Sequence, residues 1–236
     1  MEYQEDYGEL DFILSLHRAS DNNSLCENFV NGHRLLLAVN DVDLGPIDNS
    51  WFDSPDVYLL VVRRAGAAEI LGGAKLVVFD NIGNLPLLKL LTEDYPELIQ
   101  YLKDYSENGL IEISGLWNSR SVAGLGLGSE QLIRTSIAIC GLLDMGNVVT
   151  FCSPFVTRFA QLYGFSPLSK FGQNGSIPFP DSRWMSTINI LSDPHVMSKA
   201  DKIEKQIIFD LREKPNQTRK FNSRGKELTI KFELEL

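Results

Sequence analysis

The 236-residue sequence has little cysteine, no excess of positive charge and no long apolar run. Its cysteines are Cys26, Cys140 and Cys152, which have apolar neighbours and no C-x-x-C spacing. This scarcity excludes a disulfide scaffold and a cysteine-ligated zinc site. We therefore expect reduced core thiols, a cytoplasmic location and no metal site.

Acidic residues outnumber basic ones, 31 to 22, which gives a net charge of −9. This balance disfavours a nucleic-acid-binding surface. No apolar run approaches the roughly 20 residues that a membrane-spanning helix needs, and the acidic segment Met1–Gly8 does not resemble a signal peptide. We expect neither a nucleic-acid partner nor a membrane span.

The sequence does contain ample core material, because 44% of its residues are hydrophobic and 22% are charged. Its length fits a single domain over residues 1–236. Residues 1–50 are expected to be helical, with apolar residues at helical spacing over Leu10–His17 and Cys26–Leu37. His17 and His33 belong to these two patterns, where a histidine is usually packed or solvated and only occasionally catalytic.

Two runs rich in β-branched and aromatic residues, Val57–Arg63 and Ile70–Phe79, predict a β-hairpin joined by Ala65–Glu69. Because both runs are almost continuously apolar, the sheet that contains them should be covered on both faces. Gly72 and Gly73 inside the second run predict a bulge or a close backbone approach.

The rest of the chain alternates between helical and strand patterns, which predicts an α/β fold. The first expected elements are two helices over Leu85–Tyr105 broken near Pro96, a strand Leu110–Trp117 and a long helix Ser129–Met145 closed by Gly146 at C′. They are followed by a strand Val148–Cys152, a helix Phe155–Tyr163 begun by Ser153-Pro154 and a strand Trp184–Leu191. The C-terminal part, residues 192–236, is expected to contain a helix His195–Arg212, a turn-rich segment Lys214–Lys226 and a final strand Glu227–Leu236.

Three glycines, Gly124, Gly126 and Gly128, stand at alternate positions between a predicted strand and a predicted helix. Glycine lets the backbone approach a ligand closely, and a helix start offers unpaired N–H groups and a positive dipole end. The combination favours an anion site, most often for phosphate. The spacing does not match a dinucleotide fingerprint, and no lysine completes a P-loop. A tight turn without a ligand is the alternative.

The segment Ala123–Gly128 resembles the pyrophosphate loop of the GNAT acyltransferases, Q/R-x-x-G-x-G/A, in every place except the first. The order of elements from Val57 to Leu191 resembles that family too. The resemblance implies a GNAT-like α/β fold: a mixed central sheet with a splayed strand pair and helices on both faces. It also implies an acyl-CoA cosubstrate and no permanently bound cofactor. The residues implied to bind the cosubstrate are Leu116, Trp117 and Asn118 for the pantetheine, and Ala123, Gly124, Leu125, Gly126, Leu127, Gly128 and Ser129 for the pyrophosphate.

A subgroup is also indicated, since Glu112-Ile113-Ser114 and Gly73-Ala74-Lys75-Leu76 resemble motifs of acyl-homoserine-lactone synthases and N-acyl amino acid synthases. Gly115 stands where the motif E-x-S-R has Arg, and Lys75 stands where G-x-x-R-L has Arg. These departures favour a relative with an acceptor other than the lactone precursor. The acceptor's identity, CoA or acyl carrier protein as donor, acyl-chain length and oligomeric state stay open.

The reaction that the resemblance implies is attack of an amine on an acyl thioester. Glu112 is the candidate base, because a carboxylate in an apolar strand should have a raised pKa; the alternative is a solvent-facing or salt-bridged Glu112. The family's acid, a tyrosine, is replaced by Ala160, so Ser153 is the remaining candidate. Arg120 and Arg134 are expected to be solvated, with phosphate contact as the alternative.

The chain is thus expected to be an N-acyltransferase. The alternatives are a catalytically inactive acyl-CoA-binding or regulatory protein, which the absence of Gln or Arg at 123 and of Tyr at 160 favours, and an autoinducer-synthase-like N-acyl amino acid synthase. The strand through Ile111 and Leu116 should diverge from that through Val148 and Phe151. The resulting slot, lined by Trp117 and Phe151, should accept a medium or long acyl chain.

Overall fold

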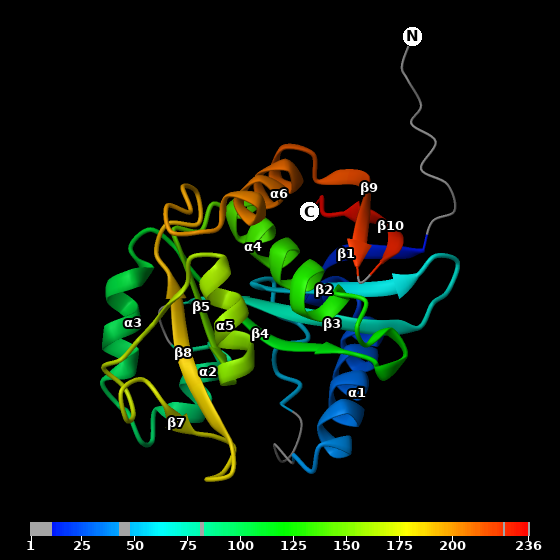
Figure 1. Ribbon diagram of the computed structural model, residues 1–236. Helices are drawn as coiled ribbons and strands as arrows, with labels where there is room; N and C mark the ends of the chain where they lie inside the picture. The colour runs from blue at the N-terminus through cyan, green and yellow to red at the C-terminus, as the bar shows by residue number, and fades with distance from the viewer. Residues whose placement is uncertain (1–10, 43–47, 81–82, 224, 236) are drawn as a thin grey trace.

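A ten-stranded sheet runs through the molecule and carries helices on both faces (Figure 1). The computed structural model describes residues 11–42, 48–80, 83–223 and 225–235. Leu10 and Leu236, at the ends of two predicted elements, lie outside this part. The arrangement confirms the predicted α/β class and the mixed central sheet.

The strand order is β6-β8-β5-β4-β3-β2-β1-β10-β9, and β7 pairs with β8 off this path. Two neighbouring pairs are parallel, β1 with β10 and β4 with β5, and the other pairs are antiparallel. The strands are β1 (Phe12–Arg18), β2 (Val57–Arg64), β3 (Ile70–Val78), β4 (Leu110–Asn118), β5 (Asn147–Cys152), β6 (Ser166–Pro167), β7 (Ile177–Pro178), β8 (Met185–Leu191), β9 (Asn216–Ser223) and β10 (Lys226–Glu233).

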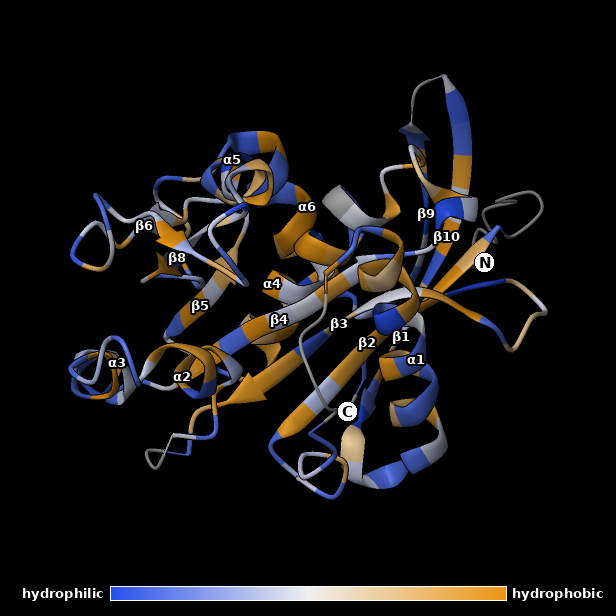
Figure 2. Cartoon of the chain, turned by 90° about the horizontal axis from the view of Figure 1, so that it is seen from below, coloured by the Kyte–Doolittle hydropathy of each residue, from blue (hydrophilic) through white to orange (hydrophobic). Residues whose placement is uncertain are grey.

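The helices divide between the two faces of the sheet (Figures 1 and 2). Helices α1, α2 and α3 pack on one face, and α4, α5 and α6 on the other. The helices are α1 (Asn23–Val39), α2 (Pro86–Leu91), α3 (Leu98–Ser106), α4 (Ile133–Leu142), α5 (Pro154–Leu162) and α6 (Lys202–Glu213), with short 3₁₀ turns at Ala19–Asp21 and Arg120–Val122 and a π-helical turn at Leu127–Leu132.

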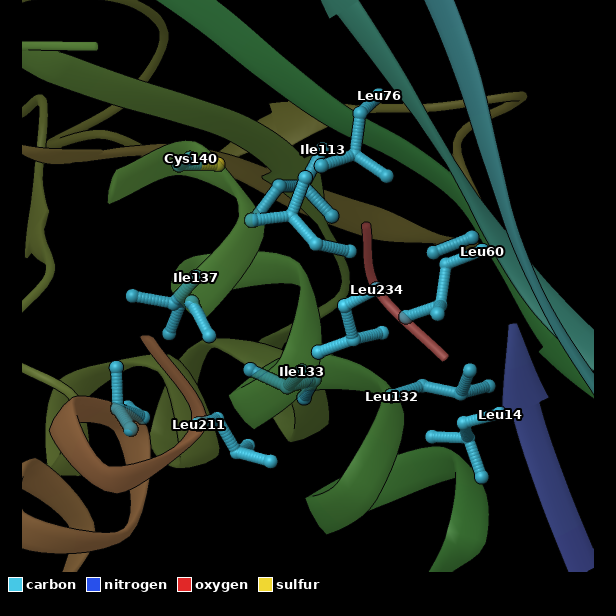
Figure 3. Close-up of a cluster of buried hydrophobic side chains, with 14 of the residues drawn as sticks. Leu14, Leu60, Leu76, Ile113, Leu132, Ile133, Ile137, Cys140, Leu211 and Leu234 are labelled. Carbon is cyan, nitrogen blue, oxygen red and sulfur yellow. The ribbon is translucent and has the colours of Figure 1, made fainter. Parts of the chain in front are cut away.

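Each face of the sheet has its own hydrophobic core. On the α4 side, Leu60 and Leu76 from the central strands and Ile137 and Leu211 from α4 and α6 belong to one cluster of buried side chains (Figure 3). On the α1 side, the core includes Phe29. Strands β2 and β3 supply both cores, which explains why they are apolar along most of their length (Figure 2).

The predicted hairpin, the two helices broken near Pro96, strands β4, β5 and β8, and helix α5 are confirmed. Gly72 and Gly73 show the predicted close approach: a Cβ on Gly72 would lie 2.7 Å from the carbonyl oxygen of Trp117, and one on Gly73 would lie 2.5 Å from that of Leu60. A side chain at either position would therefore clash with the backbone of the neighbouring strand.

The predicted helix over Leu10–His17 is wrong, because Phe12–Arg18 forms strand β1. Phe12, Leu14 and Leu16 point into the α4-side core at a period of two. The partners of β1 are β2 and β10, which lie far away in sequence, so local spacing did not distinguish strand from helix. The second predicted helix is confirmed as α1.

The C-terminal prediction also needs two corrections. Helix α6 begins at Lys202, not near His195, because the Asp201 side chain caps it by accepting hydrogen bonds from the N–H groups of Ile203 and Glu204. The segment predicted as turn-rich contains strand β9. This edge strand is polar and pairs only with β10, so it lacks the apolar alternation of an inner strand.

The long helix after the glycines begins two residues earlier and ends three residues earlier than predicted. It starts as a π-helical turn at Leu127, continues as α4 and ends at Leu142. Gly146 is not its C′ residue; Asp144 takes the left-handed conformation, with φ 56°. Gly146 instead lies against Asn108, whose carbonyl oxygen would be 2.6 Å from an added Cβ.

Candidate functional site

Strands β4 and β5 separate from each other after a short parallel contact. They pair from Leu110↔Asn147 to Glu112↔Val149, and beyond that point β4 continues beside β3 while β5 continues beside β8. The described structure thus contains the splayed strand pair that was predicted. Backbone groups along the inner edges of the splay are released from the ladder and are available to a ligand.

A bulge in β4 lies at the same place. Opposite β3, the register passes from Ser114↔Lys75 to Trp117↔Gly73, so β4 carries one extra residue there. Gly115 has φ 57°, a conformation that suits glycine, and it bends the strand where the two strands part. The glycine that departs from the E-x-S-R motif therefore has a local structural reason.

A cavity of about 1180 Å³ occupies the splay. Its lining comes from both faces of the sheet: Phe29 and His33 from α1 on one side, and Val156 and Ala160 from α5 on the other. The cavity therefore passes through the sheet between β4 and β5. Phe151 lines it as predicted and makes an edge contact with Phe179, with ring centroids 5.3 Å apart.

Glu112 lies at the last paired position before the splay, with 2% of its surface exposed. Its Oε2 accepts a 3.0 Å hydrogen bond from the N–H of Leu87. Burial raises the pKa of Glu112 to about 8, although the Leu87 N–H and the charge of Lys75 act in the opposite direction. Glu112 is neither solvent-facing nor in a salt bridge within the described residues, and it lines the cavity.

Two further titratable groups face the cavity on the α1 side of the sheet. His33 is largely buried, and burial together with the charge of Lys75 lowers its pKa to about 4, so the ring is neutral near pH 7. Burial also lowers the pKa of Lys75, whose Nζ lies 4.7 Å from the centre of the Trp51 ring. Sequence reasoning treated His33 as a packed residue and Lys75 as a motif departure, because only the fold shows that both line the same cavity as Glu112.

Ser153 lies at the end of β5 on the cavity wall, and it is exposed. It occupies the N-cap position of α5, but its side chain makes no capping hydrogen bond. The neighbouring Cys152 also lines the cavity, with its sulfur near Thr157 Oγ1 at 3.6 Å and Asn189 Nδ2 at 3.4 Å. Of the three cysteines, Cys26 and Cys140 are buried core thiols, as expected, and Cys152 is not.

The glycine-rich segment connects β4 to α4. Gly124 and Gly126 adopt φ values of 82° and 74°, so glycine is favoured at both positions. The N–H groups of Glu130 and Gln131 both bond to the carbonyl oxygen of Gly126. Those of Leu127, Gly128 and Ser129 precede them and have no acceptor within the helix, as expected at a helix start. The side chain of Ser129 lies outside the described part of the structure.

The other predicted ligand residues differ in position. Leu116 lines the cavity, and so does Ile133 at the far end of the glycine-rich segment. Trp117 does not line it: its indole packs beneath α1, close to Gly32, in an edge contact with Phe29 at 6.1 Å. Asn118 donates to the carbonyl oxygen of Ser119 and lies against Gly128.

Residues 123–126 form a turn that leads into the π-helical turn at Leu127. No residue from Ala123 to Gly128 lines the cavity, and Leu127 is buried in the α4-side core. Arg134 is not solvated: it is buried and donates to Glu204, with Nη2 2.6 Å from Oε1. The guanidinium of Arg134 is therefore paired with Glu204. Arg120, in contrast, is exposed to solvent, as expected.

Within the described residues no group of three or more acidic, histidine or cysteine side chains is arranged to hold a metal ion. None of the described helices combines the length and the apolar character needed to cross a membrane.

The splayed β4–β5 pair, the bulged β4 and the helices on both faces define a GNAT-like fold. No protein-family model and no curated protein sequence matches the chain. Among solved structures it is similar to FeeM, an N-acyl amino acid synthase from uncultured soil microbes, with a TM-score of 0.60 over 83% of this chain and 97% of that chain at 12% identity.

Two further solved structures share the fold. The CoA-dependent acyl-homoserine lactone synthase BjaI, with SAM and isopentyl-CoA, gives a TM-score of 0.55 over 86% of this chain and 90% of that one at 14% identity. An acyl-CoA N-acyltransferase from Pseudomonas aeruginosa gives 0.51 over 75% and 98% at 13% identity. At these identities the likeness establishes the fold, and it agrees with the predicted GNAT-like subgroup.

Proposed function

We propose that this protein transfers an acyl group from a pantetheine thioester to an amine by direct attack. The observation that carries the proposal is the cavity that passes through the β4–β5 splay with Glu112 on its wall. Unpaired backbone groups of the splay suit the amides of pantetheine. The glycine-rich segment before α4 suits the pyrophosphate of CoA, because a helix start offers N–H donors and a positive dipole end.

The residues would act as follows. Glu112 accepts a proton from the acceptor amine, the amine nitrogen bonds to the thioester carbonyl carbon, and the carbon–sulfur bond breaks to release a thiolate that is then protonated. With a pKa of about 8, roughly a tenth of Glu112 is ionised at pH 7, which suits a general base working near neutral pH. Ser153, on the opposite wall of the splay, is the candidate to supply the proton to the thiolate.

CoA is the donor favoured by the glycine-rich segment, because an acyl carrier protein brings pantetheine with only one phosphate. The fold neighbours include an enzyme described as CoA-dependent, which is consistent with that choice. The acceptor is proposed to be a small-molecule amine that enters on the α1 side. The protein's cytoplasmic location remains a prediction.

A binding or regulatory protein that retains the fold without catalysis is the second candidate. The observation that favours it is Ala160, which lines the cavity at the position where the GNAT family has the tyrosine that acts as the general acid. Thermal unfolding with millimolar CoA and acyl-CoA, followed by measurement of free thiol released in the presence of a panel of amines, separates the candidates. A stabilised protein that releases no thiol supports binding alone, and the absence of any stabilisation contradicts both.

A further inference from the structure

Lys75 and Glu112 lie on neighbouring strands and point to the same face of the sheet. The register pairs Lys75 with Ser114 and Val77 with Glu112, so the two ionisable side chains are diagonal neighbours. Long side chains in such positions interact across the strand pair. Both residues line the cavity, so the interaction takes place where the proposed reaction occurs.

The ammonium group of Lys75 has no carboxylate within ion-pair distance among the described residues. Its Nζ lies over the Trp51 ring, which holds the cation without neutralising it. Asp48, a carboxylate on the same cavity wall, is already bound by Lys89 at 2.6 Å. Glu112 is the carboxylate with the largest electrostatic effect on Lys75, ahead of Asp48.

Among the described residues, the other groups around Glu112 do not neutralise the positive charge of Lys75. From α2, only the neutral N–H of Leu87 contacts the carboxylate in the described structure. On α1, His33 is neutral near pH 7, and Arg34 on α1 and Asp41 just after it line the cavity with opposite charges. From β5, burial raises the pKa of Cys152, so its thiol is neutral as well.

We propose that Lys75 is a positioning residue for Glu112: its ammonium group keeps part of the carboxylate ionised, so that Glu112 can accept the proton of the acceptor amine. The proposal rests on the proposed function. In the reaction, the amine proton passes to a Glu112 oxygen, and the C–N bond forms as the C–S bond breaks. The thiolate takes a proton from Ser153, which recovers it from water, and Glu112 is regenerated by losing its proton to water. Lys75 itself exchanges no proton and touches no reacting atom.

The test measures the ionisation of Glu112 directly, without substrate. Infrared spectra of the full-length protein are recorded across pH, and the carboxyl band of Glu112 is assigned by its loss in Glu112→Gln. In Lys75→Met, the midpoint of ionisation should rise by about one pH unit, as expected when an opposite charge close to a carboxylate is removed. Lys75→Arg should restore it to near the wild-type position.

Lys89→Met is the matched control, because Lys89 lines the same cavity but is paired with Asp48. It should leave the Glu112 midpoint almost unchanged. Lys75→Gln provides a second neutral variant if Lys75→Met does not fold. An unchanged midpoint in the folded neutral variant would overturn the proposal, and so would an equal shift in Lys89→Met.

Activity gives an independent readout. Because the base must be ionised, the acidic limb of kcat/KM against pH should move upward with the infrared midpoint, and the rate at pH 7 should fall about tenfold in Lys75→Met. A rise in the KM for the acceptor with an unmoved acidic limb would instead make Lys75 a substrate-binding residue. If no acyl transfer is found, the proposed function fails, and the infrared titration still decides whether Lys75 controls the charge of Glu112.

Discussion

The backbone N–H of Leu87 donates a 3.0 Å hydrogen bond to Oε2 of Glu112. A side chain from β4 thus provides the acceptor for an N–H group in the first turn of α2. Leu85, at the N-cap position, makes no side-chain hydrogen bond to this turn. Glu112 therefore links the packing of α2 to the wall of the cavity. Substitutions of Glu112 must separate this structural contact from the proposed proton transfer.

Glu112→Gln keeps an oxygen that can accept the Leu87 N–H but removes the basic carboxylate. We expect its acyl-CoA affinity to stay near wild type and its turnover to fall by roughly 10²-fold or more, as for a lost general base. Calorimetric titration and steady-state rates measure the two effects. Glu112→Ala should in addition lose about 1–3 kcal/mol of stability, because the buried N–H is left unpaired. Full activity of Glu112→Gln at every pH would exclude Glu112 from the mechanism.

Stability should decrease with pH because of Glu112. Its pKa is about 8 in the folded protein and about 4.5 when exposed, so between these values the folded state holds a proton that the unfolded state has released. The contribution is fully present below the unfolded pKa and is lost as pH rises through the folded one. Between pH 6.5 and 8, the wild type should lose about 2 kcal/mol relative to Glu112→Gln, a comparison in which the titration of His33 cancels because both proteins contain it. Denaturant unfolding at each pH gives this difference, and parallel curves would contradict it.

Gly126→Ala should weaken CoA binding beyond its effect on folding. Gly126 has φ 74°, and an added Cβ would meet the Glu130 side chain at 3.3 Å beside the helix start. Gly66→Ala is the matched control, since Gly66 has φ 77° in the β2–β3 turn and an added Cβ would meet nothing within 4 Å. Both changes should cost about 1 kcal/mol of stability. Equal CoA affinity in the two folded variants would remove the phosphate site from the glycine-rich segment.

Phe179→Ala should shift the preference toward longer acyl chains, because it enlarges the cavity next to Phe151. Burying one more methylene contributes about 0.8 kcal/mol, or roughly fourfold in kcat/KM per carbon. Phe155→Ala serves as the control, since Phe155 is exposed on α5 and does not line the cavity. The chain-length profile of each variant is read from kcat/KM for a series of acyl-CoAs, and identical profiles would place the acyl chain elsewhere.

Local patterns in the sequence were sufficient where the chain's own periodicity decides the structure. The continuous apolar runs of β2 and β3 favour strands buried on both faces, Gly124 and Gly126 permit a turn with positive φ, and Pro154 favours the start of α5. Together with the resemblance to GNAT loops, they predicted the class of fold and the splay, whereas the sequence left open whether Glu112 is buried or faces solvent. Whether Glu112, Ser153 and the glycine-rich segment take part in a reaction is still a prediction.

Tertiary structure decided the features that depend on distant partners. Phe12–Arg18 became a strand because β2 and β10 offered edges on both its sides, and β9 became a strand because β10 lies beside it. Trp117 does not line the cavity as predicted, because its indole packs against Gly32 on α1, where the absence of a side chain leaves space for the ring. Lys75 and His33 are 42 positions apart in sequence, and only the crossing of α1 over β3 and β4 brings them to the cavity of Glu112. Such contacts between distant residues form only when the whole sheet has assembled, so no local spacing encodes them.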